Sequence, residues 1–159
     1  MPPTWPPPGA PRSSPPPSPS VNQLVTLDDA ECLDLLRTGP LGRVAVCFGA
    51  LPAVFPVHFR LLGRDPVFRT DAGTKLFAAS AGHVLCLEAD AVDPRTRTGW
   101  SVMVTGVASV LDGDDLVRAR ALDLDPWVGH GDAYVRVEAA LVSGRRVRPA
   151  VAAVASPSP

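Results

Sequence analysis

Short runs of alternating apolar and polar residues dominate the chain from residue 41 onward. In residues 41–48, Val44, Val46 and Phe48 share one face, as expected for a strand with one buried side. Comparable segments, separated by Gly, Pro or Asp turns, follow at residues 51–62, 66–70, 83–91, 99–111, 134–138 and 141–147. The short connections predict that these strands pair antiparallel.

Three helices are predicted beside the strands. Asp28 and Glu31 form a capping-box pattern that begins a helix, and the Thr-Gly-Pro sequence of residues 38–40 ends it. Shorter helices are expected over residues 74–81 and 112–122. Because helices do not alternate regularly with strands, we predict a mainly β (α+β) fold. The expected architecture is a six- to seven-stranded antiparallel β-barrel with a few short flanking helices.

Proline content sets the expected limits of the folded domain. Residues 1–20 contain ten prolines, so this segment cannot build a ladder or a core and is expected to be a disordered tail. Residues 149–159 are rich in small residues and proline, and are expected to form a second tail. The domain is therefore predicted to span residues 21–148.

Composition and charge narrow the classes of function. The formal net charge of −1 gives no support for a nucleic-acid partner. No apolar run approaches a membrane span, no secretory signal is visible, and the three cysteines are scattered, so we expect a cytoplasmic protein. No HExxH, CxxC or comparable cluster indicates a metal site, and no Ser-His-Asp motif indicates a hydrolase.

The segment of residues 68–76 is the first candidate site. A predicted strand ends there, and Gly73 leads into a helix that begins near Thr74 and Lys75, the only lysine of the chain. The free N–H groups of a helix start, a hydroxyl and a mobile cation suit a phosphate. The order differs from a Walker A loop. The alternative interpretation is therefore a turn, a helix cap and a solvated lysine.

A proline interrupts the predicted strand over residues 51–62. Pro56 is expected at a bulge or a free sheet edge, because it cannot donate to the ladder. A ligand can meet free backbone there, with Phe55 and Val57 along a planar ring and His58 at the edge of that ring. The alternative is that all three side chains belong to the core or its rim.

Further candidates lie on later strands. Trp100 and Ser101 open a long strand after a basic loop, and Trp100 either covers the end of the barrel or stacks on an aromatic cofactor. Glu88 lies on an otherwise apolar strand, so its carboxylate needs solvent, a partner or a binding site. Gly106 marks a bend or a close approach of backbones. The loop over residues 123–131 is expected to pack at the rim.

The motifs together resemble the pyridoxamine 5′-phosphate oxidase-like family, which has an FMN-binding split β-barrel. The resemblance rests on the blocks LGRVAV, VFPVHF, FRTDAGTKL, CLEAD and TGWSVMVTGVA in this order, and it covers residues 24–148. Within the family, the small actinobacterial-type flavoproteins are the most similar group.

This resemblance implies a homodimer with FMN at the subunit interface. Arg69, Thr70, Thr74 and Lys75 match the family positions that hold the FMN phosphate and nearby flavin atoms. The strand of residues 55–58 matches the one that lies along the isoalloxazine. Trp100 and Ser101 match positions that approach from the neighbouring subunit, and Glu88 completes the set of candidate cofactor-binding residues.

The function implied is that of an FMN-binding oxidoreductase-like protein. It would transfer hydride or electrons between the flavin and an unidentified small molecule, and no catalytic residue is assigned. The chain lacks the extended C-terminal block of the true pyridoxamine-phosphate oxidases, so that substrate is not expected. The alternatives are an F420-dependent reductase on the same barrel and a non-catalytic flavin-binding or carrier module. Haem is a further cofactor of the family.

Overall fold

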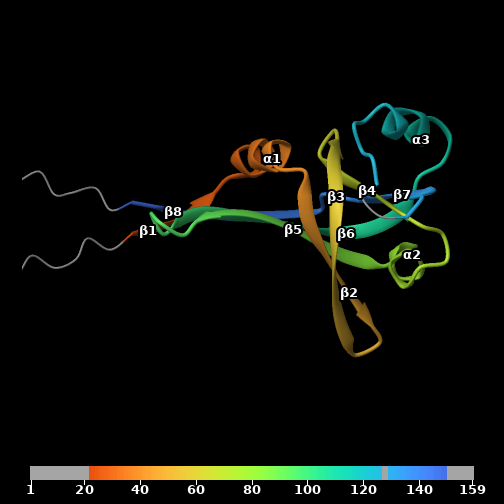
Figure 1. Cartoon of the computed structure of the whole chain (residues 1–159), viewed down its shortest axis with the longest axis horizontal. Coiled ribbons are helices and arrows are strands. Elements are labelled where there is room, and N and C mark those ends of the chain that lie inside the picture. Colours follow the sequence, from red (N-terminus) through yellow and green to blue (C-terminus); the bar gives the residue numbers. More distant parts are fainter. Residues whose placement is uncertain (1–21, 127–128, 150–159) are drawn as a thin grey trace, which may run out of the picture.

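The computed structural model describes residues 22–126 and 129–149, which form one antiparallel sheet of eight strands flanked by helices (Figure 1). The predicted tails, residues 1–20 and 149–159, lie outside these ranges except for Pro149. In chain order the elements are β1 (Gln23–Leu27), α1 (Asp29–Thr38), β2 (Leu41–Phe48), β3 (Leu51–Leu62), β4 (Asp65–Thr70), α2 (Lys75–Ser80), β5 (Val84–Asp93), β6 (Thr98–Val110), α3 (Gly113–Arg120), β7 (Ala133–Val137) and β8 (Leu141–Arg148).

Six of the strands close into a barrel. The order β6-β5-β2-β3-β4-β7 is closed by an additional pairing of β6 with β7, which confirms the predicted antiparallel barrel. β8 and β1 extend the sheet from β6, away from the barrel. β1 was not predicted from the sequence. The apolar residues of its sequence, QLVTL, do not alternate regularly with polar ones, and only Leu27 is buried.

β6 exchanges one partner strand for another near Gly106. It pairs with β8 as far as Thr105 and with β7 from Ala108. A Cβ atom on Gly106 would clash with the carbonyl oxygen of Glu138, so the predicted close approach is confirmed. The absence of a side chain at this position lets one long strand serve both the barrel and the outlying strands.

The barrel interior and α1 share one apolar core. Phe59 and Phe68 are completely buried inside it. α1 begins with the predicted capping box, in which the Glu31 N–H donates to Asp28 Oδ1 at 2.8 Å and the Asp28 N–H donates to Glu31 Oε2 at 3.1 Å. Cys32 of this helix is buried, and its thiol pKa is raised by burial and then by the nearby carboxylates. The capping box therefore sets where α1 begins, and the buried Cys32 shows that the helix packs on the core.

β3 has a free edge along its first half. It pairs with β2 from Leu51 to His58, but with β4 only from Phe59 onward. Pro56 lies on the part of β3 that lacks the second partner, so the prediction of an edge position is confirmed. Proline has no backbone N–H, and on the free side of β3 no neighbouring strand is left without a hydrogen-bond donor.

Neither a membrane span nor a metal cluster is found in the ranges that the structure describes. None of the described helices is long and apolar enough to cross a membrane. No group of three or more His, Cys, Asp or Glu side chains within the described ranges could hold a metal ion.

Candidate functional site

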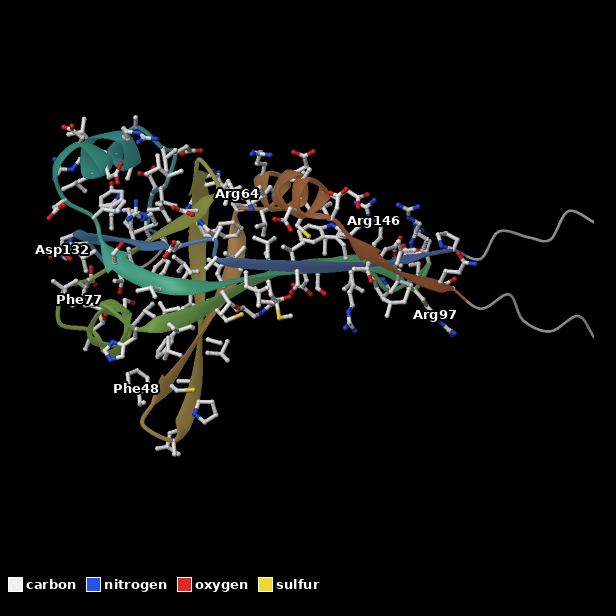
Figure 2. The ribbon with its side chains drawn as sticks, turned by 180° about the vertical axis from the view of Figure 1, so that it is seen from behind. Phe48, Arg64, Phe77, Arg97, Asp132 and Arg146 are labelled. Atoms are coloured by element: carbon white, nitrogen blue, oxygen red, sulfur yellow. The ribbon has the colours of Figure 1, made fainter. Side chains whose placement is uncertain are left out.

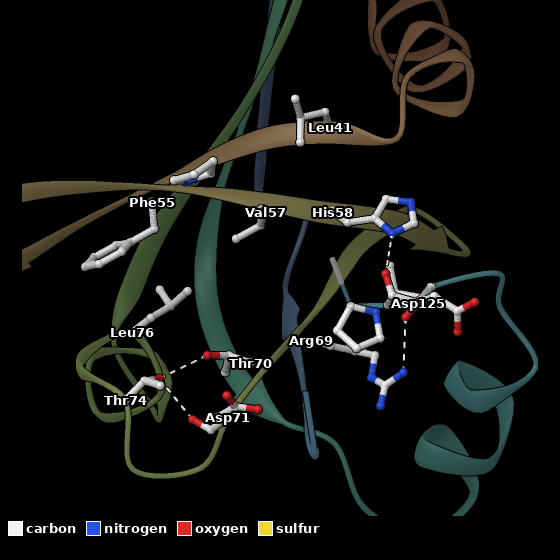
Figure 3. A pocket seen from close by; sticks show the side chains of 13 residues that line it. Leu41, Phe55, Val57, His58, Arg69, Thr70, Asp71, Thr74, Leu76 and Asp125 are labelled. Atoms are coloured by element: carbon white, nitrogen blue, oxygen red, sulfur yellow. Dashed lines mark hydrogen bonds between the residues drawn. The ribbon is translucent and has the colours of Figure 1, made fainter. Parts of the chain in front are cut away.

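A cavity of about 400 Å³ lies at the free edge of β3 (Figure 3). Its walls come from β3, the end of β4, the start of α2 and the segment that follows α3. The lining residues are Leu41, Phe55, Pro56, Val57, His58, Arg69, Thr70, Asp71, Thr74, Leu76, Leu124, Asp125 and Pro126. The structure thus brings six of the ten predicted cofactor-binding residues together around one cavity.

The β3 side of the cavity is apolar. Phe55 and Val57 alternate with Pro56 along the strand, and both point toward Leu76 of α2 in Figure 3. Phe55 is held by an edge-on contact with Phe48, with ring centroids 6.4 Å apart. Val57 and Leu76 are both buried at the cavity wall. This side suits a flat apolar ring rather than a charged group.

The opposite side carries hydroxyl groups. Thr74 is the N-cap of α2: its Oγ1 accepts from the Phe77 N–H at 3.1 Å and donates to the Asp71 carbonyl oxygen at 2.9 Å. The buried Thr70 hydroxyl lies 3.0 Å from the same Thr74 oxygen. Lys75 begins α2, but its side chain lies outside the described part of the structure. The hydroxyls are therefore fixed by local hydrogen bonds.

Arg69 points into the segment that follows α3. Its Nε donates to the Gly131 carbonyl oxygen at 2.7 Å, its Nη2 to that of His130 at 3.1 Å and its Nη1 to that of Leu124 at 3.4 Å. The guanidinium also lies over the Tyr134 ring, 4.9 Å from the centroid. The predicted phosphate contact thus competes with three backbone acceptors for the donors of Arg69.

His58 bonds to the same segment from the other side of the cavity. Its Nδ1 lies 2.9 Å from the carbonyl oxygen of Asp125 (Figure 3). Because a carbonyl oxygen only accepts, this contact places the proton on Nδ1. No sequence pattern indicated that Asp125 and its neighbours Leu124 and Pro126 would line the cavity, and the loop was expected only to pack at the rim.

Comparison with known proteins agrees with the sequence motifs. The family model described as pyridoxamine 5′-phosphate oxidase matches residues 28–146. The chain belongs to the pyridoxamine 5′-phosphate oxidase family. The resemblance inferred from the motifs is thereby confirmed.

Among similar proteins, "Uncharacterized protein Rv0080" of Mycobacterium tuberculosis is 40% identical over 147 residues, which cover 88% of this chain and 94% of the relative. A solved FAD binding protein from Mycobacterium smegmatis has a TM-score of 0.70 at 36% identity, over 77% of this chain and 98% of its own. A putative pyridoxamine 5′-phosphate oxidase from Corynebacterium glutamicum has a TM-score of 0.69 at 31% identity, over 79% of this chain and 93% of its own.

In this member of the pyridoxamine 5′-phosphate oxidase family, Trp100 and Ser101 lie apart from the first cavity. They line a second cavity of about 530 Å³, together with Arg97, Arg145 and other residues. This cavity lies on the outlying strands, by which we mean β1, β8 and the adjoining ends of β5 and β6. Figure 2 shows Arg97 near the tip of these strands, far from Phe77 of α2. One chain alone therefore does not bring the two predicted groups together.

Glu88 lines neither cavity. Its Oε2 lies 3.2 Å from Nη1 of Arg43, and Oδ1 of Asp90 lies 2.7 Å from the same nitrogen. Hydrogen bonds and charge attraction from these carboxylates raise the pKa of Arg43, and Asp90 has the larger effect. Arg43 is therefore the partner of the Glu88 carboxylate.

Proposed function

We propose that this chain binds a flavin in the cavity at the free edge of β3 and serves as an FMN-dependent oxidoreductase. The observation that carries the proposal is the cavity itself. It joins an apolar wall from Phe55 and Val57 to a hydroxyl-bearing wall from Thr70 and Thr74, in a chain of this family. Flavin mononucleotide has the same division, with an apolar ring at one end and a phosphate at the other.

The residues present fit such a ligand. Phe55, Val57 and Leu76 would contact the ring, and the Thr70 and Thr74 hydroxyls would hydrogen-bond the polar chain. Lys75, the first residue of α2, would add a cation for the phosphate. A bound flavin supplies the hydride and electron transfer chemistry. The protein's part is to orient the ring and to keep water away from its apolar side.

A homodimer would complete the site. Along the register, Val54, Ala45, Cys86, Thr105 and Leu141 form one row across five strands. This row belongs to the outer sheet face, where several side chains, including Val54 and Leu141, are more than half exposed. Exposed apolar side chains grouped on one sheet face are typical of a protein interface.

The same interface would explain the two separate groups of predicted residues. Trp100 and Ser101 line a cavity on the outlying strands, away from the cavity at β3. In a two-fold dimer, each copy presents the same face to the other. The outlying strands of one copy would then cover the β3 cavity of the second copy.

FAD is a second candidate cofactor. The solved Mycobacterium smegmatis protein with 36% identity is described as FAD binding. An adenylate extension would leave the β3 cavity beyond the phosphate end, whereas FMN would end there. F420 binding and a carrier role without catalysis are the other candidates, and the experiments below separate them. A small-molecule substrate in the cytoplasm completes the proposal.

The direct test is to purify the full chain and identify any bound cofactor by its absorbance and by chromatography after denaturation. We expect FMN. Released FAD or F420 would replace FMN in the proposal, and a colourless protein that binds neither added FMN nor added FAD would refute it. Oxidation of NADH or NADPH by the loaded protein would then distinguish an enzyme from a carrier.

The residue-level test is Lys75→Ala, with Arg37→Ala as the matched control. Arg37 is an exposed cation on α1 that pairs with Asp34, away from the cavity. We expect Lys75→Ala to weaken FMN binding while riboflavin, which lacks the phosphate, binds as before. Equal affinity of FMN for Lys75→Ala and Arg37→Ala would remove Lys75 from the site.

A further inference from the structure

Two side chains at the end of β4 fasten the segment that closes the cavity opposite β3. We call this segment, residues 124–126 and 129–132, the wall loop. Leu124, Asp125 and Pro126 of the wall loop line the cavity. Arg69 and Asp71 flank the buried Thr70. Both side chains bond to the backbone of the wall loop, which lies more than fifty residues later in the sequence.

Arg69 acts as a fork between both parts of the wall loop. Its guanidinium reaches the carbonyl oxygen of Leu124 on one side and those of His130 and Gly131 on the other. Stacking over Tyr134 fixes the plane of the fork. A planar group with donors in several directions can hold separated acceptors at once, which a single ammonium cannot do in the same geometry.

Asp71 completes the fastening with the opposite charge. Its Oδ1 accepts from the backbone N–H groups of His130 and Gly131. Asp132 adds a reciprocal bond, since its Oδ1 accepts from the Ala72 N–H at 3.0 Å. A carboxylate beside a phosphate would repel it, so phosphate binding does not account for Asp71.

We propose that Arg69 and Asp71 are positioning residues for the wall loop, and that they control flavin affinity through Leu124, Asp125 and Pro126 rather than through contact with the phosphate. The inference rests on the proposed function for its ligand, but the fastening itself is a property of the protein alone. It assigns Arg69 a role different from that implied by the family motif.

Comparison of FMN with riboflavin separates the two roles. For full-chain Arg69→Met and Asp71→Ala, we expect FMN and riboflavin to lose affinity by the same factor, about tenfold or more. Lys75→Ala serves as the phosphate-specific comparison and Arg37→Ala as the neutral control. Selective loss of FMN in Arg69→Met, or tighter FMN binding in Asp71→Ala, would overturn the proposal.

A second measurement separates positioning from general destabilisation. At saturating FMN, the visible circular dichroism of bound flavin should change in Arg69→Lys and Asp71→Ala, because the wall against the ring has moved. It should not change in Gly106→Ala, which weakens the fold at a site away from the cavity. A change of equal size in Gly106→Ala, or none in Arg69→Lys, would assign both residues a structural role only.

Hydrogen exchange of the cofactor-free protein tests the fastening without any flavin. We expect the amides of His130 and Gly131, which donate to Asp71 Oδ1, to exchange faster in Asp71→Ala than in the wild type, with the strands of the barrel unchanged. Unchanged exchange would refute the fastening. If the wild type bound no flavin but showed this effect, the proposed function would fail while the fastening would stand.

Discussion

The Thr74 hydroxyl offers a quantitative test of how the cavity wall is built. In Thr74→Ala, the N-cap of α2 loses its acceptor for the Phe77 N–H, and the buried Thr70 hydroxyl loses its partner. Loss of a cap costs about 1 kcal/mol, and an unsatisfied buried hydroxyl costs about 1 kcal/mol more. We therefore expect the free energy of unfolding to fall by about 2 kcal/mol.

Thr74→Ser is the matched control, because it keeps the hydroxyl and removes only a methyl group. Urea unfolding of the cofactor-free protein measures both variants, and a lower midpoint at unchanged slope reports the stability loss. For a domain of this size we expect Thr74→Ala to melt roughly 6–10 °C below the wild type. If Thr74→Ala and Thr74→Ser differed by less than about 0.5 kcal/mol, the hydroxyl would not carry the stability assigned to it.

Three other predictions concern the fold, the cysteines and the assembly. Gly106→Ala should lower the free energy of unfolding by more than about 2 kcal/mol, because the new Cβ meets the carbonyl oxygen of Glu138; an unchanged urea midpoint would contradict this. A thiol reagent at pH 8 should label the exposed Cys47 in the native protein and the buried Cys32, whose thiol pKa is raised, only after unfolding; rapid native labelling of Cys32 would contradict its placement. Met103→Glu should convert the proposed dimer to a monomer in light scattering, since Met103 lies on the outer sheet face; a wild type that is already monomeric would refute the dimer.

Local chemistry accounts for what the sequence predicted correctly. The capping box at Asp28 and Glu31 needs only four consecutive residues, and the alternation of β5 needs only its own ten. Pro56 restricts its strand to a free edge or a bulge wherever the strand is placed. Such signals act between near neighbours, so they survive without knowledge of the remaining chain. β1 lacked a local signal and was missed, because its pairing with β8 defines it as a strand.

Contacts between strands decide which residues share a cavity, and the pattern of a single strand does not reveal these contacts. Glu88 was a candidate because of its place on an apolar strand, but its partner Arg43 lies forty-five residues earlier in the chain. Trp100 was expected to approach the cofactor from the neighbouring subunit, and within one chain it lines a different cavity from the Thr74 segment. Distances between strands depend on closure of the barrel, which the residues of one strand do not encode.

Sequence patterns were sufficient to predict seven of the eight strands, the capping box of α1, the family and the apolar and hydroxyl-bearing segments that meet at the β3 cavity. The bonds of Arg69 and Asp71 to the wall loop became apparent only from the folded chain. The partners of these two side chains are backbone carbonyl and N–H groups. Every residue carries these groups, so side-chain identity in the wall loop gives no sign of the contact until the chain has folded.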